Sequence, residues 1–231
     1  MLIGTMLVRN EAGRWLRQVL EQMASVCDKI IVLDDHSTDD TPEICRDYGA
    51  DVFYSDRSYW GTNELRQRKF LWELATSEAK TGDWILCLDA DETMPNIYLL
   101  PPLLPIIKDI GCECAAFRLY DMWDEARYRD DDLWIGHKMH WPFCVMYNAD
   151  KEYRWQEIPL HCGRFPKNAY ERMAQTGIEI LHWGWSREED RKAKYERYLK
   201  ADPEGKWGFV EQYLSILDKN PNLRRFDGRS K

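Results

Sequence analysis

The feature that most constrains the fold is an alternation of apolar, strand-like runs with helix-like segments over residues 1–95. The apolar runs predict four strands, at residues 2–8, 29–33, 51–54 and 84–88. Apolar residues at helical spacing predict helices at residues 12–25 and 62–76, and a further helix that starts near residues 37–43. Such alternation with short links is typical of a parallel sheet with right-handed crossovers. We therefore predict an α/β fold with a mostly parallel central sheet flanked by helices.

The alternation weakens after Pro95. We expect short strands and long loops over residues 121–174, where aromatic and charged residues show little periodicity. The remaining expected elements are helices at residues 98–110, 187–199 and 207–217, strands at 114–123 and 178–183, and a polar tail at 219–231 that frays. Neither a repeat nor a low-complexity linker interrupts the 231 residues, so a single domain is predicted.

Charge and cysteine content narrow the class of protein. The chain has 32 Lys and Arg against 40 Asp and Glu, a net charge of −8, which argues against binding nucleic acid by bulk charge. No apolar run approaches the roughly 20 residues that span a bilayer, and the first residues do not form a signal peptide. The 7 Cys residues, without a C-x-x-C pair, fit reduced thiols. We predict a cytoplasmic location, with at most peripheral contact with the inner membrane face.

Carboxylates follow two of the predicted strands. Asp34 and Asp35 follow residues 30–33, and Asp89, Asp91 and Glu92 follow residues 84–88. Ligands of parallel sheets bind beyond the carboxyl ends of the strands, so these side chains are expected at one edge. Five carboxylates there repel one another unless a cation is present, and Mg²⁺ or Mn²⁺ bridging carboxylates to phosphates suits this need. The alternative is that the Asp-x-Asp segment is a solvated loop.

These motifs resemble those of the family 2 glycosyltransferases, which use nucleotide-diphosphate sugars. Residues 32–41 (VLDDHSTDDT) are close to the family's V-D-D-x-S-x-D-x-T, and residues 82–92 (GDWILCLDADE) are close to its G-(E/D)-(W/Y)-I-x-x-L-D-A-D-E. Residues 6–11 (MLVRNE), 67–69 (QRK) and 182–185 (HWGW) also correspond. Within the family, the D-A-D-E ending is most similar to the bacterial lipopolysaccharide-core β-glucosyltransferase type. The resemblance implies a GT-A, Rossmann-like fold.

The resemblance also implies roles. The first strand would border the base and ribose, Asp35 would accept from the uracil N3–H, and Arg68 would approach the diphosphate. Asp89 would face the ribose, and Asp91 would bind a divalent cation, Mn²⁺ or Mg²⁺. The donor-binding residues implied are Val8, Arg9, Asp34, Asp35, Arg68, Asp89, Ala90 and Asp91. Two alternatives stay open: Asp34 as a loop cap, and Arg68 on an ordinary solvated helix face.

The general base is less clearly marked. An inverting transferase needs one near the acceptor hydroxyl, usually Asp, Glu or His. Our candidates, in order, are Glu157, His161 and Asp132. Where an His-Glu pair would be expected, the chain has His161-Cys162, which leaves both the base and the choice between inversion and retention open.

Several other residues of the second half allow either a functional or a structural interpretation. The resemblance implies that His182 completes the metal site with Asp89 and Asp91, and its neutral imidazole suits Mn²⁺; otherwise it is a cleft-wall histidine. The acceptor cleft is expected to contain Trp134, Trp183 and Trp185, whose rings would stack on sugars or simply pack. In the charged segment 187–197, opposite charges at helical spacing favour a solvated face, with Arg187 and Lys194 reaching the cleft as the alternative.

The resulting prediction is a metal-dependent, hexosyltransferase-like glycosyltransferase. Residues 1–95 would bind a nucleotide-diphosphate sugar, with UDP as the expected nucleotide, and residues 96–218 would bind the acceptor and supply the base. We expect inversion by direct displacement. The acceptor is open: a carbohydrate, lipid-linked, protein or modified-nucleobase hydroxyl. The alternatives are a non-catalytic sugar- or nucleotide-binding module, and a sugar nucleotidyltransferase, which usually has a Gly-rich loop where this chain reads Val8-Arg9-Asn10-Glu11.

Overall fold

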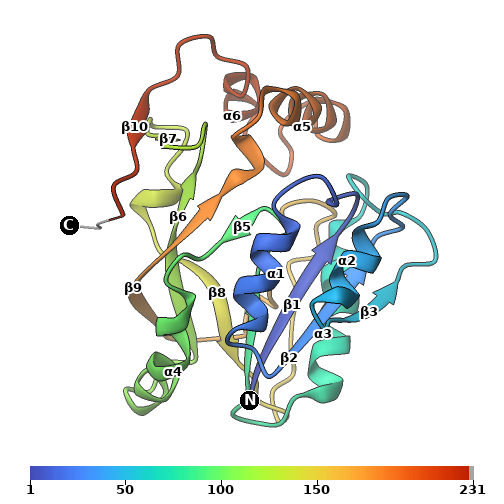
Figure 1. The fold of residues 1–231 in the computed structure, drawn as a ribbon, viewed down its shortest axis with the longest axis vertical. Coiled ribbons are helices and arrows are strands. Elements are labelled where there is room, and N and C mark those ends of the chain that lie inside the picture. Colours follow the sequence, from blue (N-terminus) through green and yellow to red (C-terminus); the bar gives the residue numbers. More distant parts are fainter. Residues whose placement is uncertain (229–231) are drawn as a thin grey trace.

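The computed structural model describes residues 1–228, so the last three residues of the predicted tail, 229–231, lie outside the described part. A large sheet runs through the molecule, with strand order β3-β2-β1-β4-β8-β6-β9-β5 (Figure 1). The strands are β1 (Leu2–Val8), β2 (Lys29–Asp34), β3 (Asp51–Tyr54), β4 (Trp84–Cys87), β5 (Glu92–Thr93), β6 (Cys114–Asp121), β7 (Arg127–Arg129), β8 (Trp141–Met146), β9 (Met173–His182) and β10 (Leu223–Arg225).

The first half is the predicted parallel sheet. β1 lies between β2 and β4 and is parallel to both, and β2 is parallel to β3. All seven residues of β1 are buried, as expected for a central strand covered on both faces. In the sheet formed by residues 1–228, β6–β9 is also parallel, whereas β4–β8, β6–β8 and β5–β9 are antiparallel. The prediction of a single α/β domain with a mostly parallel sheet is confirmed.

Helices cover both faces of this sheet. They are α1 (Leu16–Ala24), α2 (Thr41–Asp47), α3 (Glu64–Glu78), α4 (Leu100–Asp109), α5 (Glu188–Ala201) and α6 (Val210–Ser215), with short 3₁₀ turns at Ile97–Leu99, Gly136–Lys138 and Trp183–Trp185. Apolar residues of α1, α2 and α4 pack with Met6 and Val8 of β1 in one core. Leu71, Trp72 and Ala75 of α3 pack with Ile3 and Leu7 on the other face. Alternate β1 residues therefore serve opposite cores.

The second half departs from the prediction in detail. β9 begins at Met173, five residues before the predicted strand; its first residues alternate in exposure, and only residues 178–181 are continuously buried. Helix α6 is shorter than the predicted segment 207–217. The polar tail is not wholly frayed, since β10 pairs antiparallel with β7. No helix within residues 1–228 is long and apolar enough to cross a membrane.

Helices α5 and α6 lie at the end of the sheet where β1 and β2 finish (Figure 1). They follow the 3₁₀ turn after β9, so the late strand delivers them to this edge. Residues at the carboxyl ends of β1, β2 and β4 and residues of the two C-terminal helices line one cavity, together with Asp35, Asp89, Asp91 and Glu92.

Candidate active site

A cavity of about 350 Å³ lies at this edge of the sheet. One side is formed by residues that follow β1, β2 and β4 and by α3, and the other by residues of α5 and α6. Of the residues predicted to bind the donor, Asp35, Arg68, Asp89, Ala90 and Asp91 line it. This is the position at which parallel α/β sheets bind ligands.

Asp35, just past the end of β2, is held rigidly. Its carboxylate accepts hydrogen bonds from the Ser58 hydroxyl at 2.9 Å, from the Tyr59 backbone N–H at 2.9 Å and from the Gln67 amide. Arg9 donates to the Asp35 carbonyl oxygen at 3.0 Å. The Tyr59 N–H also lies 3.1 Å from the second carboxylate oxygen, so four contacts within the protein reach this buried carboxylate, which offers about four acceptor positions.

Asp34, Val8 and Arg9 are not among the described residues that line the cavity. The Asp34 carboxylate accepts from the Ser37 backbone N–H at 2.9 Å, which is the loop-capping role considered as the alternative. Val8 is fully buried in the core at the end of β1. These residues shape the wall through Asp35 and the loop after β2.

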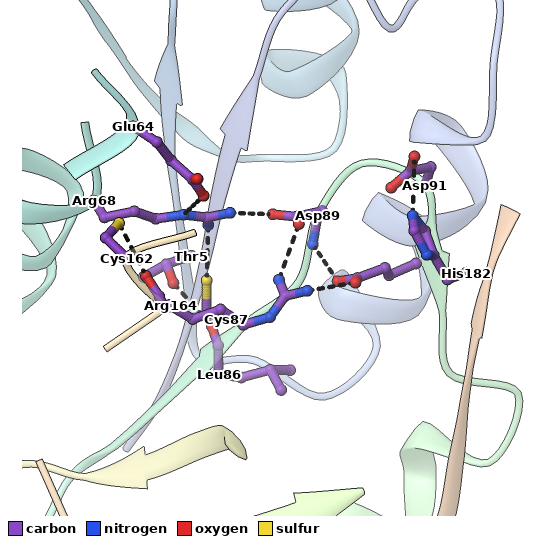
Figure 2. A network of polar contacts seen from close by, with 12 residues as sticks. Thr5, Glu64, Arg68, Leu86, Cys87, Asp89, Asp91, Cys162, Arg164 and His182 are labelled. Atoms are coloured by element: carbon purple, nitrogen blue, oxygen red, sulfur yellow. Dashed lines mark hydrogen bonds and ion pairs between the residues drawn. The ribbon is translucent and has the colours of Figure 1, made fainter. Parts of the chain in front are cut away.

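Asp89 is fixed between two guanidinium groups. Arg68 donates to its carboxylate at 2.9 Å and Arg164 lies 3.1 Å from its other oxygen, as Figure 2 shows. Arg164 also pairs with buried Glu92, whose carboxylate accepts from the Asp89 backbone N–H at 2.8 Å. Burial works to raise the pKa of Asp89, but Arg164 and then Arg68 outweigh it and hold that pKa below its usual value.

Asp91 faces a separate group of polar side chains (Figure 2). Its carboxylate lies 3.4 Å from the Lys194 ammonium and 3.6 Å from His182 Nε2. The opposite ring nitrogen of His182, Nδ1, lies 2.8 Å from the Asp121 carboxylate, which orients the ring. Lys194 and His182 outweigh the effect of burial and lower the pKa of Asp91 well below its ordinary value.

The donor set fits a divalent cation with few protein ligands. Asp91 offers carboxylate oxygens, while Asp89 is occupied by Arg68 and Arg164. Burial works to lower the pKa of His182, but Asp91 outweighs it and raises that pKa to about 10, so Nε2 would have to release its proton to bind the cation. Across residues 1–228, no group of three or more His, Cys, Asp or Glu side chains is placed to hold a metal. Mg²⁺ and Mn²⁺ commonly take one or two protein ligands and complete their shell with water and substrate phosphates.

The three candidate bases are differently placed. His161 lines the cavity, and its Nε2 lies 2.9 Å from the Tyr213 hydroxyl. The Glu157 side chain is 68% exposed and pairs with Lys69 at 2.7 Å. Asp132 is fully exposed, 4.0 Å from Lys138. Neither Glu157 nor Asp132 is among the described residues that line the cavity.

Only some of the predicted cleft tryptophans and of the predicted basic residues near α5 line the cavity. Trp134 and Trp185 line the cavity, whereas Trp183 stacks on Trp15 with ring centroids 4.3 Å apart. Lys194 reaches the cavity, whereas Arg187 donates to a backbone carbonyl at Gly13. Each of the two predicted groups therefore places only some of its members at the site.

Several cavity residues were given no role from the sequence. Arg164 is the most important, because it compensates both Asp89 and Glu92. Glu11 is another: it is buried, lines the cavity and pairs with Arg14 at 3.6 Å. Burial, reinforced by Asp91, raises the pKa of Glu11 to about 8 against the opposing effect of Arg14. The sequence signal that could have indicated Arg164 is the excess of carboxylates expected at the sheet edge, which needs basic side chains nearby for compensation.

The fold and the cavity define an α/β protein that binds its ligand beyond the carboxyl ends of parallel strands. The family model described as "Glycosyl transferase family 2" matches residues 6–166, well over half of the chain. The chain belongs to this glycosyltransferase family.

Two individual relatives share less than a third of their aligned residues with this chain. The chain is 27% identical over 226 residues to an uncharacterized protein of Mycobacterium tuberculosis, covering 92% of this chain and 54% of that one. It is 29% identical over 185 residues to an uncharacterized glycosyltransferase of Rickettsia prowazekii, covering 78% and 51%. The chain thus spans about half the length of these relatives. Among solved structures, glucosyl-3-phosphoglycerate synthase of Mycobacterium tuberculosis is similar with a TM-score of 0.39 and 20% identity, over 52% of this chain and 44% of that one.

Proposed function

We propose that this protein transfers a hexose from a UDP-linked sugar to an acceptor hydroxyl, with the help of a divalent cation and with inversion at the anomeric carbon. The observation that carries the proposal is the single cavity that brings Asp35, the Arg68–Asp89 pair and Asp91 together in a member of the family. Residues 1–95 would hold the nucleotide sugar, and residues 96–218 the acceptor.

The donor-binding roles follow from the chemistry of each side chain. Asp35, which lines the cavity, would accept from the N3–H of a uracil ring in exchange for one of its present donors. Asp89, fixed by Arg68 and Arg164, would accept hydrogen bonds from the ribose hydroxyls. The same two guanidinium groups would attract the diphosphate, since guanidinium pairs well with phosphate oxygens.

Asp91 and His182 Nε2 would hold the cation, with His182 oriented by Asp121. When bound, the cation would neutralise the charge that develops on the leaving diphosphate. Lys194, 3.4 Å from Asp91, would add positive charge on the same side of the cavity.

The acceptor side is aromatic. Trp134 and Trp185 offer ring faces that suit a carbohydrate, such as the lipopolysaccharide-core sugars of the enzymes that the sequence resembles. An acceptor hydroxyl would lose its proton to His161, and its oxygen would attack the anomeric carbon as the bond from that carbon to the diphosphate breaks. His161 takes this role because it lines the cavity, unlike Glu157 and Asp132.

The test is a screen of UDP-, GDP- and dTDP-sugars for Mn²⁺-dependent release of the nucleoside diphosphate. We expect release from a UDP-sugar, even to water, and its loss in Asp91→Ala, because that change removes the carboxylate that we place against the cation. Asp109→Ala, at an exposed position of α4, is the matched control and should keep wild-type activity. Full activity in Asp91→Ala would show that the cation site is wrongly placed.

A second experiment distinguishes the effect of a bound cation from the effect of the Lys194 ammonium. If release persists in EDTA but is lost in Lys194→Met, the ammonium rather than a metal supplies the positive charge near Asp91. Binding of UDP-sugar without release of UDP under any metal condition would instead favour the non-catalytic binding module.

A further inference from the structure

Asp202 is a buried carboxylate with a complete set of hydrogen-bond donors. It is 1% exposed and follows the last residue of α5. It accepts from the backbone N–H groups of Lys206 at 2.7 Å, Trp207 at 3.1 Å and Gly208 at 2.9 Å, and from the Tyr213 hydroxyl at 3.0 Å. Burial works to raise the pKa of Asp202, but these donors outweigh it and lower the pKa below its ordinary value. Asp202 is therefore ionised and can only accept.

This arrangement decides what the Tyr213 hydroxyl can do. A phenol has one proton, and here the proton points to Asp202. Burial and the Asp202 carboxylate raise the pKa of Tyr213 above its usual value, so the proton stays on the oxygen at neutral pH. Towards His161 Nε2, 2.9 Å away, the Tyr213 oxygen can then only accept.

The direction of this hydrogen bond determines which ring nitrogen of His161 carries the hydrogen. If Tyr213 accepts, Nε2 must carry the hydrogen, and in a neutral imidazole the lone pair is then on Nδ1. The ring is held by contacts with the Tyr213 and Tyr198 rings, at centroid distances of 6.2 and 5.8 Å. Its backbone is in the left-handed region, with φ of 56°, and its N–H donates to Glu64 at 3.2 Å. A strained conformation held on several sides is typical of functional positions.

The loop before α6 leaves room for this contact only because residue 208 is glycine. A Cβ at Gly208 would lie 1.8 Å from the Tyr213 hydroxyl oxygen and 3.1 Å from His161 Nε2. The same residue donates its N–H to Asp202. Gly208 therefore brings the three side chains into contact.

We propose that Asp202 and Tyr213 are positioning residues that fix the tautomer of His161, so that Nδ1 is the proton acceptor for the incoming hydroxyl. This inference rests on the proposed function. In the transfer step, the acceptor O–H proton moves to Nδ1 and the oxygen forms the new bond to the anomeric carbon. The bond to the diphosphate breaks with its electron pair leaving on UDP, and the imidazolium, stabilised through Tyr213 by Asp202, returns its proton to water.

Imidazole ¹⁵N–¹H correlation spectra of the whole protein test the tautomer directly, with no substrate present. The chain has 5 His residues, and His161→Asn identifies the signals of His161 while keeping a residue that tolerates left-handed φ. We expect His161 to be the Nε2–H tautomer in wild type and to become a mixture in Tyr213→Phe. An Nδ1–H tautomer in the wild-type protein would overturn the inference, whatever the enzyme does.

Steady-state release of UDP from UDP-glucose supplies the second readout. Tyr213→Phe should lower kcat about 10- to 100-fold, and His161→Asn by about 100-fold or more, with KM for UDP-glucose unchanged. Tyr195→Phe, on α5 and outside the cavity lining, is the matched control and should match wild type. Unchanged kcat in Tyr213→Phe contradicts the inference, whereas a wild-type protein inactive with every nucleotide sugar contradicts the proposed function, and the spectra still report the tautomer.

Discussion

At the residue scale, Glu11 is a carboxyl group whose charge the fold disfavours. It is 6% exposed, its Oε2 has no hydrogen-bond partner among the described residues, and burial raises its pKa to about 8 from an ordinary value of 4.5. The folded state therefore holds a proton between these two pH values that the unfolded state has released. By linkage, the stability contributed by this group falls as pH rises from 4.5 to 8.

The prediction is that Glu11→Gln removes this pH dependence, because an amide cannot ionise. Between pH 5 and pH 8, in EDTA, wild type should lose more unfolding free energy than Glu11→Gln by at least about 1.4 kcal/mol, the equivalent of one pKa unit. Denaturant unfolding at several pH values measures the difference. Parallel curves for the two proteins would mean that Glu11 is ionised in the fold, compensated by Arg14.

Single residues also show where sequence reasoning stopped. Asp35, Asp89 and Asp91 could be predicted because they follow apolar runs, which place them at one edge of a parallel sheet. Arg164 could not, because it comes from a loop without periodicity and reaches Asp89 only through the folding of the second half. The same holds for Tyr213, which is 52 residues from His161 in sequence.

At the element scale, the contact of β1 with α1 depends on a missing side chain. A Cβ at Gly4 of β1 would lie 2.5 Å from Met23 Cε of α1 and 2.9 Å from Cys27 Sγ. Met23 is fully buried, so its terminal methyl group could move only by displacing neighbours in the core. The helix can therefore lie this close to the strand only because residue 4 has no side chain.

We expect Gly4→Ala to destabilise the protein by about 1–3 kcal/mol, the usual effect of overpacking a dense core. Gly13→Ala is the matched control, since a Cβ there meets nothing within 4 Å. Thermal and denaturant unfolding of the two variants gives the comparison. Equal stabilities would show that α1 shifts away from β1 without loss.

Elements of the first half were predictable because each has a complete local signal. β1 and β3 have the predicted bounds, since each is a short run limited by charged residues or turns. In the second half, β8 is inserted between β4 and β6, and this non-local pairing leaves no mark on the local pattern. The first residues of β9 alternate in exposure and pair with β6, which only the assembled sheet shows.

At the scale of the whole molecule, the cavity joins two parts of the chain that are built differently. The parallel strands β1, β2 and β4 deliver the carboxylates, and helices α5 and α6, more than 90 residues later, deliver Lys194 and Tyr213 (Figure 1). A ligand in the cavity therefore contacts both parts. Binding to the folded state alone stabilises the whole fold by mass action.

This predicts cooperative stabilisation by nucleotide and cation. UDP with Mn²⁺ at about 100 times the dissociation constant should add about 2.7 kcal/mol, or roughly 5–10 °C in Tm for a domain of this size. Either ligand alone should do less, because in our proposal a cation bound by Asp91 and His182 keeps coordination positions that the diphosphate fills. Asp91→Ala should lose the Mn²⁺-dependent part of the shift, whereas His161→Asn should keep it, since His161 faces the acceptor in our proposal. Thermal shift assays on the three proteins decide between a shared donor–cation site and two independent sites, which would give additive shifts.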